Sequence, residues 1–144
     1  MEKFDGSLFI KRVMDDFIPM RSFTGIDLLN HNDNSVSVKI HFDEELVSNV
    51  PDREVHNGIL ASAMDAVGGA IAMKQLTNGD HLSTINMNVN YLRRTKPKDI
   101  VIDAKITKNG QRVIYTEMSA HHVDEDSRIL ATANATYSHM KKEH

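Results

Sequence analysis

The stretch Gly58–Met73 constrains the fold most, because it is rich in Ala, Gly, Ile and Met and holds one charged residue, Asp65. Its spacing predicts a helix of about five turns over Asn57–Gln75, closed by Asn78-Gly79. A helix that is apolar nearly all round is internal, so it needs cover on most of its circumference. The rest of the chain therefore has to supply a layer that wraps around it.

The segments around this helix alternate apolar and polar residues with a period of two, which is typical of half-buried strands. These segments are Ser35–Phe42, Ile85–Tyr91, Ile100–Ile106, Gln111–His121 and Ile129–Tyr137. Asn109-Gly110 is a strong hairpin signal, and the short connections favour antiparallel pairing. We therefore expect an α+β fold in which a curved antiparallel sheet wraps around one long central helix.

No repeat or linker divides the 144 residues, so we expect a single domain over residues 1–144 with an amphipathic helical lead-in at 1–20. The formal charge of -3 argues against a nucleic-acid partner, and the lack of Cys excludes thiol catalysis and zinc held by thiolates. The eight His residues show no metal-ligand spacing, so no metal is expected. Without a bilayer-length apolar run or a signal peptide, the sequence predicts a cytoplasmic protein with no membrane partner.

Asp65 is anomalous, because an unpaired buried carboxylate costs several kcal/mol. The residues three and four positions away on its helical face are all small: Ala61, Ser62, Gly68 and Gly69. Gly within a helix costs about 0.5–1 kcal/mol relative to Ala, so the Gly pair indicates close approach of a neighbouring backbone or of a ligand. Two interpretations stay open: Asp65 is a functional group, or it points to solvent through a gap in the sheet.

The predicted helix begins at Val55-His56-Asn57-Gly58. Free backbone N–H groups and the helix dipole at this end can stabilise a developing oxyanion, but the same residues also suit a plain helix cap. Asp65 lies eight residues after Asn57, a little over two turns along the helix. The two could therefore flank a carbonyl group.

The run HNGILASAMDAVGGAIA resembles the HGG(x6)D signature of hotdog-fold acyl-CoA thioesterases of the phenylacetate-pathway type. The later run STINMNVNYLRRTKPKD, the hairpin and the Ala/Thr-rich last segment are similar to the rest of that domain. The resemblance covers roughly residues 20–140. It implies a thioesterase that hydrolyses an acyl-CoA to the acid and coenzyme A, and that needs no cofactor. It also implies a homodimer, with a dimer of dimers as a further assembly.

The resemblance also implies roles for individual residues. Asp65 would act on the thioester carbonyl as nucleophile or as general base, and the backbone N–H of Asn57 would polarise its oxygen. Thr84 matches a family hydroxyl supplied from the other subunit. Strict alternation places Thr84 with the Asn residues and Ser83 on the core face, so Ser83 is the alternative. The expected substrate-binding residues are Asn49, His56, Gly58, Ser83, Arg93 and Lys108, of which Arg93 and Lys108 would hold coenzyme A phosphates.

Two departures from the family pattern bear on activity. Asn57 replaces the middle Gly of HGG, and Val50 stands where the family often has Asn, with Asn49 beside it. These departures leave open a non-catalytic acyl-CoA binding or sensor module. A hotdog enoyl-thioester hydratase ranks lower, since neither the Pro-rich His motif nor the Asp-x4-His motif of such enzymes is present.

Overall fold

The computed structural model describes residues 23–42, 48–49, 54–77 and 79–141. The predicted helical lead-in, residues 1–20, lies outside these ranges. In chain order the elements are β1 Phe23–His31, β2 Ser35–Phe42, β3 Ser48–Asn49, β4 Glu54–Val55, α3 Asn57–Met73, β5 His81–Tyr91, β6 Ile100–Asn109, β7 Val113–His122 and β8 Ile129–Met140.

Helix α3 packs against the sheet, as its apolar composition predicts. It begins at Asn57 after the N-cap His56 and ends at Met73, two residues before the predicted Gln75. Lys74 caps its C-terminal end by donating a backbone hydrogen bond to the carbonyl of Ala70. Nearly the whole second half of the helix is buried, as predicted for an internal helix, whereas in the first half Asn57 and Gly58 are exposed and Asp65 is half-buried.

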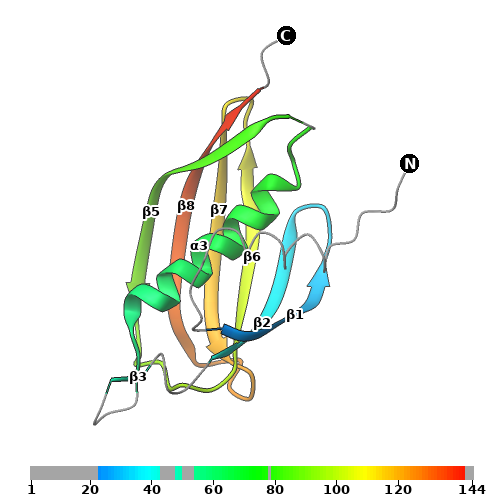
Figure 1. The fold of residues 1–144 in the computed structure, drawn as a ribbon. Coiled ribbons are helices and arrows are strands. Elements are labelled where there is room, and N and C mark those ends of the chain that lie inside the picture. The colour runs from blue at the N-terminus through cyan, green and yellow to red at the C-terminus, as the bar shows by residue number, and fades with distance from the viewer. Residues whose placement is uncertain (1–22, 43–47, 50–53, 78, 142–144) are drawn as a thin grey trace.

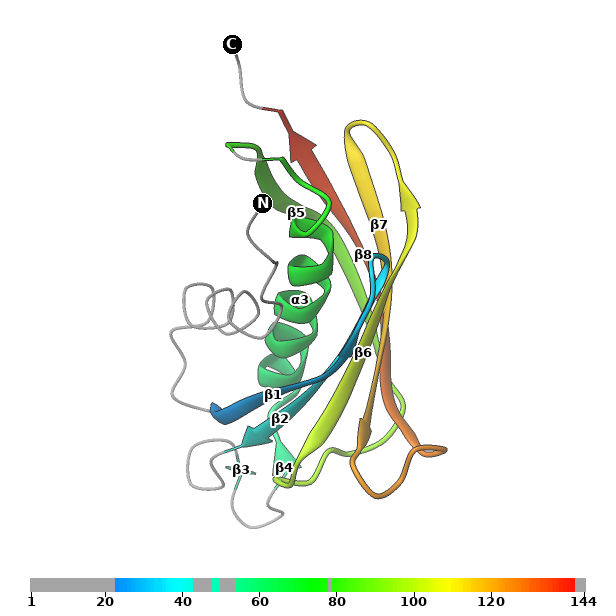
Figure 2. The same ribbon diagram turned by 90° about the vertical axis from the view of Figure 1, so that its right-hand side faces the viewer.

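The sheet is antiparallel and has six strands in the order β1-β2-β6-β7-β8-β5 (Figure 1). It curves around one side of α3, as the rotated view shows (Figure 2). The hairpin predicted at Asn109-Gly110 joins β6 to β7, and the Gly110 N–H donates to the Val113 carbonyl at 2.9 Å. The α+β prediction is confirmed.

The inward-facing residues of the strands form one apolar core with the helix. Val38 and Ile40 of β2, Ile102 of β6 and Ile114 of β7 are completely buried against it. The opposite face of the sheet carries the polar members of each alternation, such as Asp103 of β6. Within the described ranges, no helix is long and apolar enough to cross a bilayer.

Candidate active site

Asp65 lies on the side of α3 that meets β5 and β8, and its side chain is half-buried. The Thr84 hydroxyl of β5 donates to Asp65 Oδ1 at 3.1 Å, and the Tyr137 hydroxyl of β8 lies 3.1 Å from the same oxygen. Tyr137 also lies 3.1 Å from the backbone carbonyl oxygen of Asp65. No hydroxyl or amide of the described residues bonds Oδ2. The carboxylate is thus held on one oxygen, rather than pointing through a gap into solvent.

Thr84 reaches Asp65 because β5 contains a β-bulge at Ile85. Thr84 pairs with Tyr137 and Asn86 with the next residue of β8, so Ile85 has no partner in the ladder. A bulge inserts one residue and reverses the inward and outward alternation beyond it. The prediction from strict alternation, with Ser83 on the core face and Thr84 on the Asn face, is therefore wrong.

The Gly pair makes room for side chains of the sheet. A Cβ at Gly68 would lie 2.6 Å from Met118 Sδ and 2.7 Å from the Tyr137 hydroxyl oxygen, closer than real Cβ contacts. A Cβ at Gly69 would lie 3.7 Å from a Tyr137 ring carbon, which is ordinary contact. The close approach expected from the sequence is thus made by β7 and β8 side chains, not by a backbone or a ligand. Tyr137 was not predicted as a site residue from the sequence. The one feature of the sequence that indicated a group packed closely against the helix near Asp65 was Gly68.

A small crevice opens beside the carboxylate. It has a volume of about 20 Å³, and its walls include Asp65, Thr84 and Tyr137 together with the apolar Met73 and Leu82. A space of this size accommodates one water molecule. Within one chain, the crevice therefore fits a small reactant at Asp65 and not an acyl chain.

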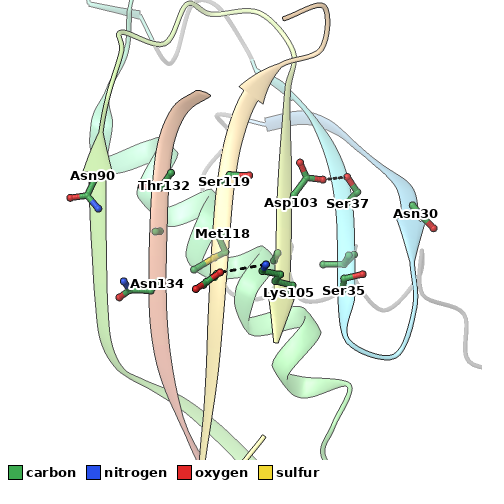
Figure 3. A pocket seen from close by; sticks show the side chains of 14 residues that line it. Asn30, Ser35, Ser37, Asn90, Asp103, Lys105, Met118, Ser119, Thr132 and Asn134 are labelled. Carbon is green, nitrogen blue, oxygen red and sulfur yellow. Dashed lines mark hydrogen bonds and ion pairs between the residues drawn. The ribbon is translucent and has the colours of Figure 1, made fainter. Parts of the chain in front are cut away.

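A much larger hollow of about 690 Å³ lies on the opposite face of the sheet (Figure 3). Its lining is largely polar; Ser37 donates a hydrogen bond to Asp103, and Lys105 forms an ion pair with Glu117 at 3.6 Å. The sheet separates it from Asp65, so we place the chemistry at the smaller crevice in spite of the difference in size. Throughout the described ranges, no three His, Asp or Glu side chains are arranged to hold a metal ion.

The start of α3 is a capped helix end with one amide left over. His56 Nδ1 accepts a hydrogen bond from the Gly58 N–H at 3.0 Å, which satisfies that amide. No described residue accepts a hydrogen bond from the Asn57 N–H. Asn57 and Gly58 are both exposed. The Tyr91 hydroxyl donates to the Asn57 carbonyl at 3.0 Å, and the partial burial of this largely exposed side chain raises the pKa of Tyr91, so the hydroxyl keeps its proton.

Asn57 and Asp65 of one chain lie too far apart to act on the same carbonyl. Eight residues of α-helix separate them, a rise of about 12 Å. Thr84, by contrast, bonds Asp65 of its own chain. The expectation that Thr84 comes from the other subunit is therefore wrong for its contact with Asp65. The prediction that Asn57 and Asp65 flank one carbonyl group does not hold within a single chain.

The predicted coenzyme A residues do not meet within one chain. Arg93 follows β5 and donates to the Ile129 carbonyl at 2.6 Å, at the end of the sheet where β8 begins. Lys108 lies near the opposite end of the sheet, where its Nζ is 5.9 Å from the centre of the Tyr115 ring. Arg93 and Lys108 of the same chain therefore cannot bind one phosphate group of coenzyme A together. Asn49 belongs to β3, and its side chain lies outside the described residues.

The chain is similar to known proteins over most of its length. The family model described as "Thioesterase superfamily" matches residues 54–129. A Halobacterium salinarum protein named as a candidate esterase is 30% identical over 118 residues, covering 80% of this chain and 77% of that protein. The medium/long-chain acyl-CoA thioesterase YigI of Salmonella typhimurium is 23% identical, with 94% of this chain and 91% of the relative covered.

Solved structures share the fold. A hypothetical thioesterase protein of Streptococcus pneumoniae, crystallised with coenzyme A, superposes with a TM-score of 0.76 at 18% identity. The superposition covers 94% of this chain and 99% of that chain. At this identity the likeness shows a common architecture, in which one helix is wrapped by a curved antiparallel sheet.

Proposed function

Because this chain belongs to the thioesterase superfamily and is a thioester hydrolase of the hotdog fold, we propose that its substrate is an acyl-CoA. The reaction would release the free acid and coenzyme A. The names of the YigI relatives and the coenzyme A bound in a structural neighbour support this substrate class. The observation that carries the proposal is the half-buried Asp65, held by Thr84 beside a crevice of about 20 Å³.

Asp65 would act through Oδ2, the oxygen that has no partner among the described residues. As a general base, Oδ2 takes a proton from water while the water oxygen attacks the thioester carbon. As a nucleophile, Oδ2 attacks that carbon itself, and water then hydrolyses the resulting anhydride. In both routes the carbon–sulfur bond breaks and the coenzyme A sulfur ends protonated. The size of the crevice suits a water molecule, which both routes consume.

The Asn57 N–H would stabilise the oxyanion, aided by the dipole of α3. Since about 12 Å of helix separates Asn57 from Asp65, the amide must come from a second subunit. Strand β5 offers the surface for that subunit, because within the described sheet it is an edge strand with β8 as its one neighbour. Ile85, Tyr91 and Leu92 expose large apolar side chains along or just beyond it. An exposed apolar edge of this kind favours pairing with a second copy of the strand.

The contacts of the site favour one register for this pairing. Inward-facing residues must lie opposite inward-facing residues, a condition that twofold axes at Met87, Asn88 and Val89 all satisfy. Of these, the axis at Asn88 is the one that pairs Thr84 with Tyr91. Asn86 then lies opposite Asn90 of the partner subunit. Beyond the bulge, Thr84 lies opposite Tyr91 of the partner subunit. In each chain the Tyr91 hydroxyl is hydrogen-bonded to the Asn57 carbonyl, and Thr84 is hydrogen-bonded to Asp65. This register would therefore bring the backbone N–H of Asn57 of the partner subunit close to Asp65.

The register predicts a specific cross-link. The chain contains no Cys, so Asn88→Cys creates a single thiol at the proposed twofold axis. Mild oxidation should convert most of this variant to a covalent dimer, visible by non-reducing electrophoresis, because Cβ atoms of opposing strand residues approach disulfide distance. Asn86→Cys alone is the matched control and should stay uncross-linked, whereas the double Asn86→Cys/Asn90→Cys variant should cross-link. Efficient cross-linking of Asn86→Cys with none at Asn88→Cys would contradict the register.

The substrate class is tested with purified protein and a panel of acyl-CoAs of different chain length, with free thiol measured by a thiol reagent. We expect turnover of at least one acyl-CoA, and no turnover of it by the Asp65→Ala variant. Tight binding of acyl-CoAs without thiol release would instead indicate a binding module. Thiol release that survives Asp65→Ala would contradict the proposed site.

A further inference from the structure

Tyr137 is the second hydroxyl on Asp65, and it is far more buried than the first. Its side chain is 1% exposed, whereas Thr84 is exposed. A phenol hydroxyl in such surroundings is costly unless it is hydrogen-bonded, and the acceptors here are Oδ1 and the carbonyl oxygen of Asp65, both at 3.1 Å. Burial, and next the negative charge of Asp65, raise the pKa of Tyr137 well above its ordinary value. The hydroxyl therefore keeps its proton and donates.

The helix is built to admit this hydroxyl. Gly68 lies one turn after Asp65 on the same face, and a Cβ there would lie 2.7 Å from the Tyr137 oxygen. A Cβ at Gly68 would also lie 2.6 Å from Met118 Sδ. Gly within a helix costs about 0.5–1 kcal/mol relative to Ala, so its presence is explained by the space that Tyr137 and Met118 need. The contact joins residues that are 72 positions apart and ties the carboxylate of α3 to the rigid strand β8.

We propose that Tyr137 is a positioning residue, whose hydroxyl fixes Oδ1 of Asp65 so that Oδ2 is presented to the substrate. This inference rests on the proposed function of Asp65. Thr84 and Tyr137 contact the same oxygen from β5 and β8, so the carboxylate cannot rotate without breaking both bonds. A reacting group held by two such bonds is preorganised, and small misplacements of such groups reduce turnover strongly.

The first test is Tyr137→Phe, which removes one oxygen atom and keeps the ring. We expect kcat to fall by roughly tenfold with KM within about twofold, because positioning affects the reacting group and not substrate binding. Tyr115→Phe deletes a hydroxyl from an exposed tyrosine of β7 and should change neither constant. A change in KM alone, or an unchanged kcat in Tyr137→Phe, would overturn the proposal.

A second test leaves Tyr137 intact and crowds its hydroxyl. Gly68→Ala should lower kcat by a similar factor, because its methyl group would meet the Tyr137 oxygen as well as the flexible end of Met118, and the oxygen at the end of a rigid ring cannot move aside as easily. Gly69→Ala is the matched control, since its Cβ would make ordinary contact at 3.7 Å. Equal activity of the two Ala variants would contradict the role of Tyr137. Thermal unfolding of each variant shows that the comparison is made between folded proteins.

A double variant separates this inference from the proposed function. If Tyr137 acts through Asp65, then Tyr137→Phe should have no further effect in an Asp65→Asn background. A further tenfold loss in that background would show that Tyr137 acts independently, and would overturn the inference while leaving Asp65 in place. Full activity of Asp65→Asn itself would instead remove the proposed function.

Discussion

Asp65→Asn should lower kcat/KM for acyl-CoA hydrolysis by roughly 10³-fold or more, within the range found for general bases and nucleophiles. The amide has nearly the shape of the carboxylate, and its oxygen can still accept the bonds from Thr84 and Tyr137. It cannot take a proton from water, however, and it does not attack a thioester. Steady-state thiol release by parent and variant measures the effect.

The Asp65→Asn experiment needs a control for folding and one for surface charge. The melting temperature of the variant should stay close to that of the parent, because the carboxylate is half-buried and its bonds persist. Asp103→Asn removes a carboxylate from the opposite face of the sheet and should leave kcat/KM unchanged. Comparable losses in both variants would mean that the effect of Asp65 is not local to its site.

Asn57→Pro should lower kcat by roughly 10²–10³-fold, because it removes the backbone N–H that would stabilise the oxyanion. The substitution suits the local structure. Pro is favoured at the first residue of a helix, where no intrahelical bond is lost. The preceding residue, His56, has φ -59° and ψ 133°, which is the extended conformation that a following Pro requires.

The side chain of Asn57 is tested separately from its amide. Asn57→Ala and Asn57→Gly keep the N–H, so both should retain kcat within a few-fold of the parent. Circular dichroism and thermal unfolding establish that Asn57→Pro is folded. Undiminished turnover by Asn57→Pro would exclude the proposed oxyanion site, and a large loss in Asn57→Ala would assign the effect to the side chain instead.

Periodicity predicted most of the fold because burial on one face imposes it locally. The period of two in Ser35–Phe42 and in Ile100–Ile106 matches strands β2 and β6, and the apolar run after His56 matches helix α3. The hairpin at Asn109-Gly110 follows from turn chemistry, which is also local. Each of these features is determined by residues within a few positions of one another.

The details of the site depend on contacts that no local pattern contains. The bulge at Ile85 is a property of the pairing between β5 and β8, so alternation within β5 could not reveal that Thr84 faces the helix. The contact of Tyr137 with Asp65 joins two elements distant in sequence. Arg93 and Lys108 are both basic residues near the ends of strands, but the pairing of the strands places them near opposite ends of the sheet. Sequence reasoning could therefore identify Asp65, whose charge is anomalous in its own helix, more readily than its partners.

Subunit complementation tests most directly whether Asp65 of one subunit and the Asn57 amide of the other act on one carbonyl. Chains carrying Asp65→Asn and Asn57→Pro are co-expressed with different tags, and the heterodimer is purified. One of its two symmetric sites then has both groups intact, so we expect about half of the parent's activity, although each homodimer is nearly inactive. A heterodimer of the parent with the double variant should be nearly inactive. The reverse pattern, activity in the second heterodimer and none in the first, would contradict a site shared between subunits.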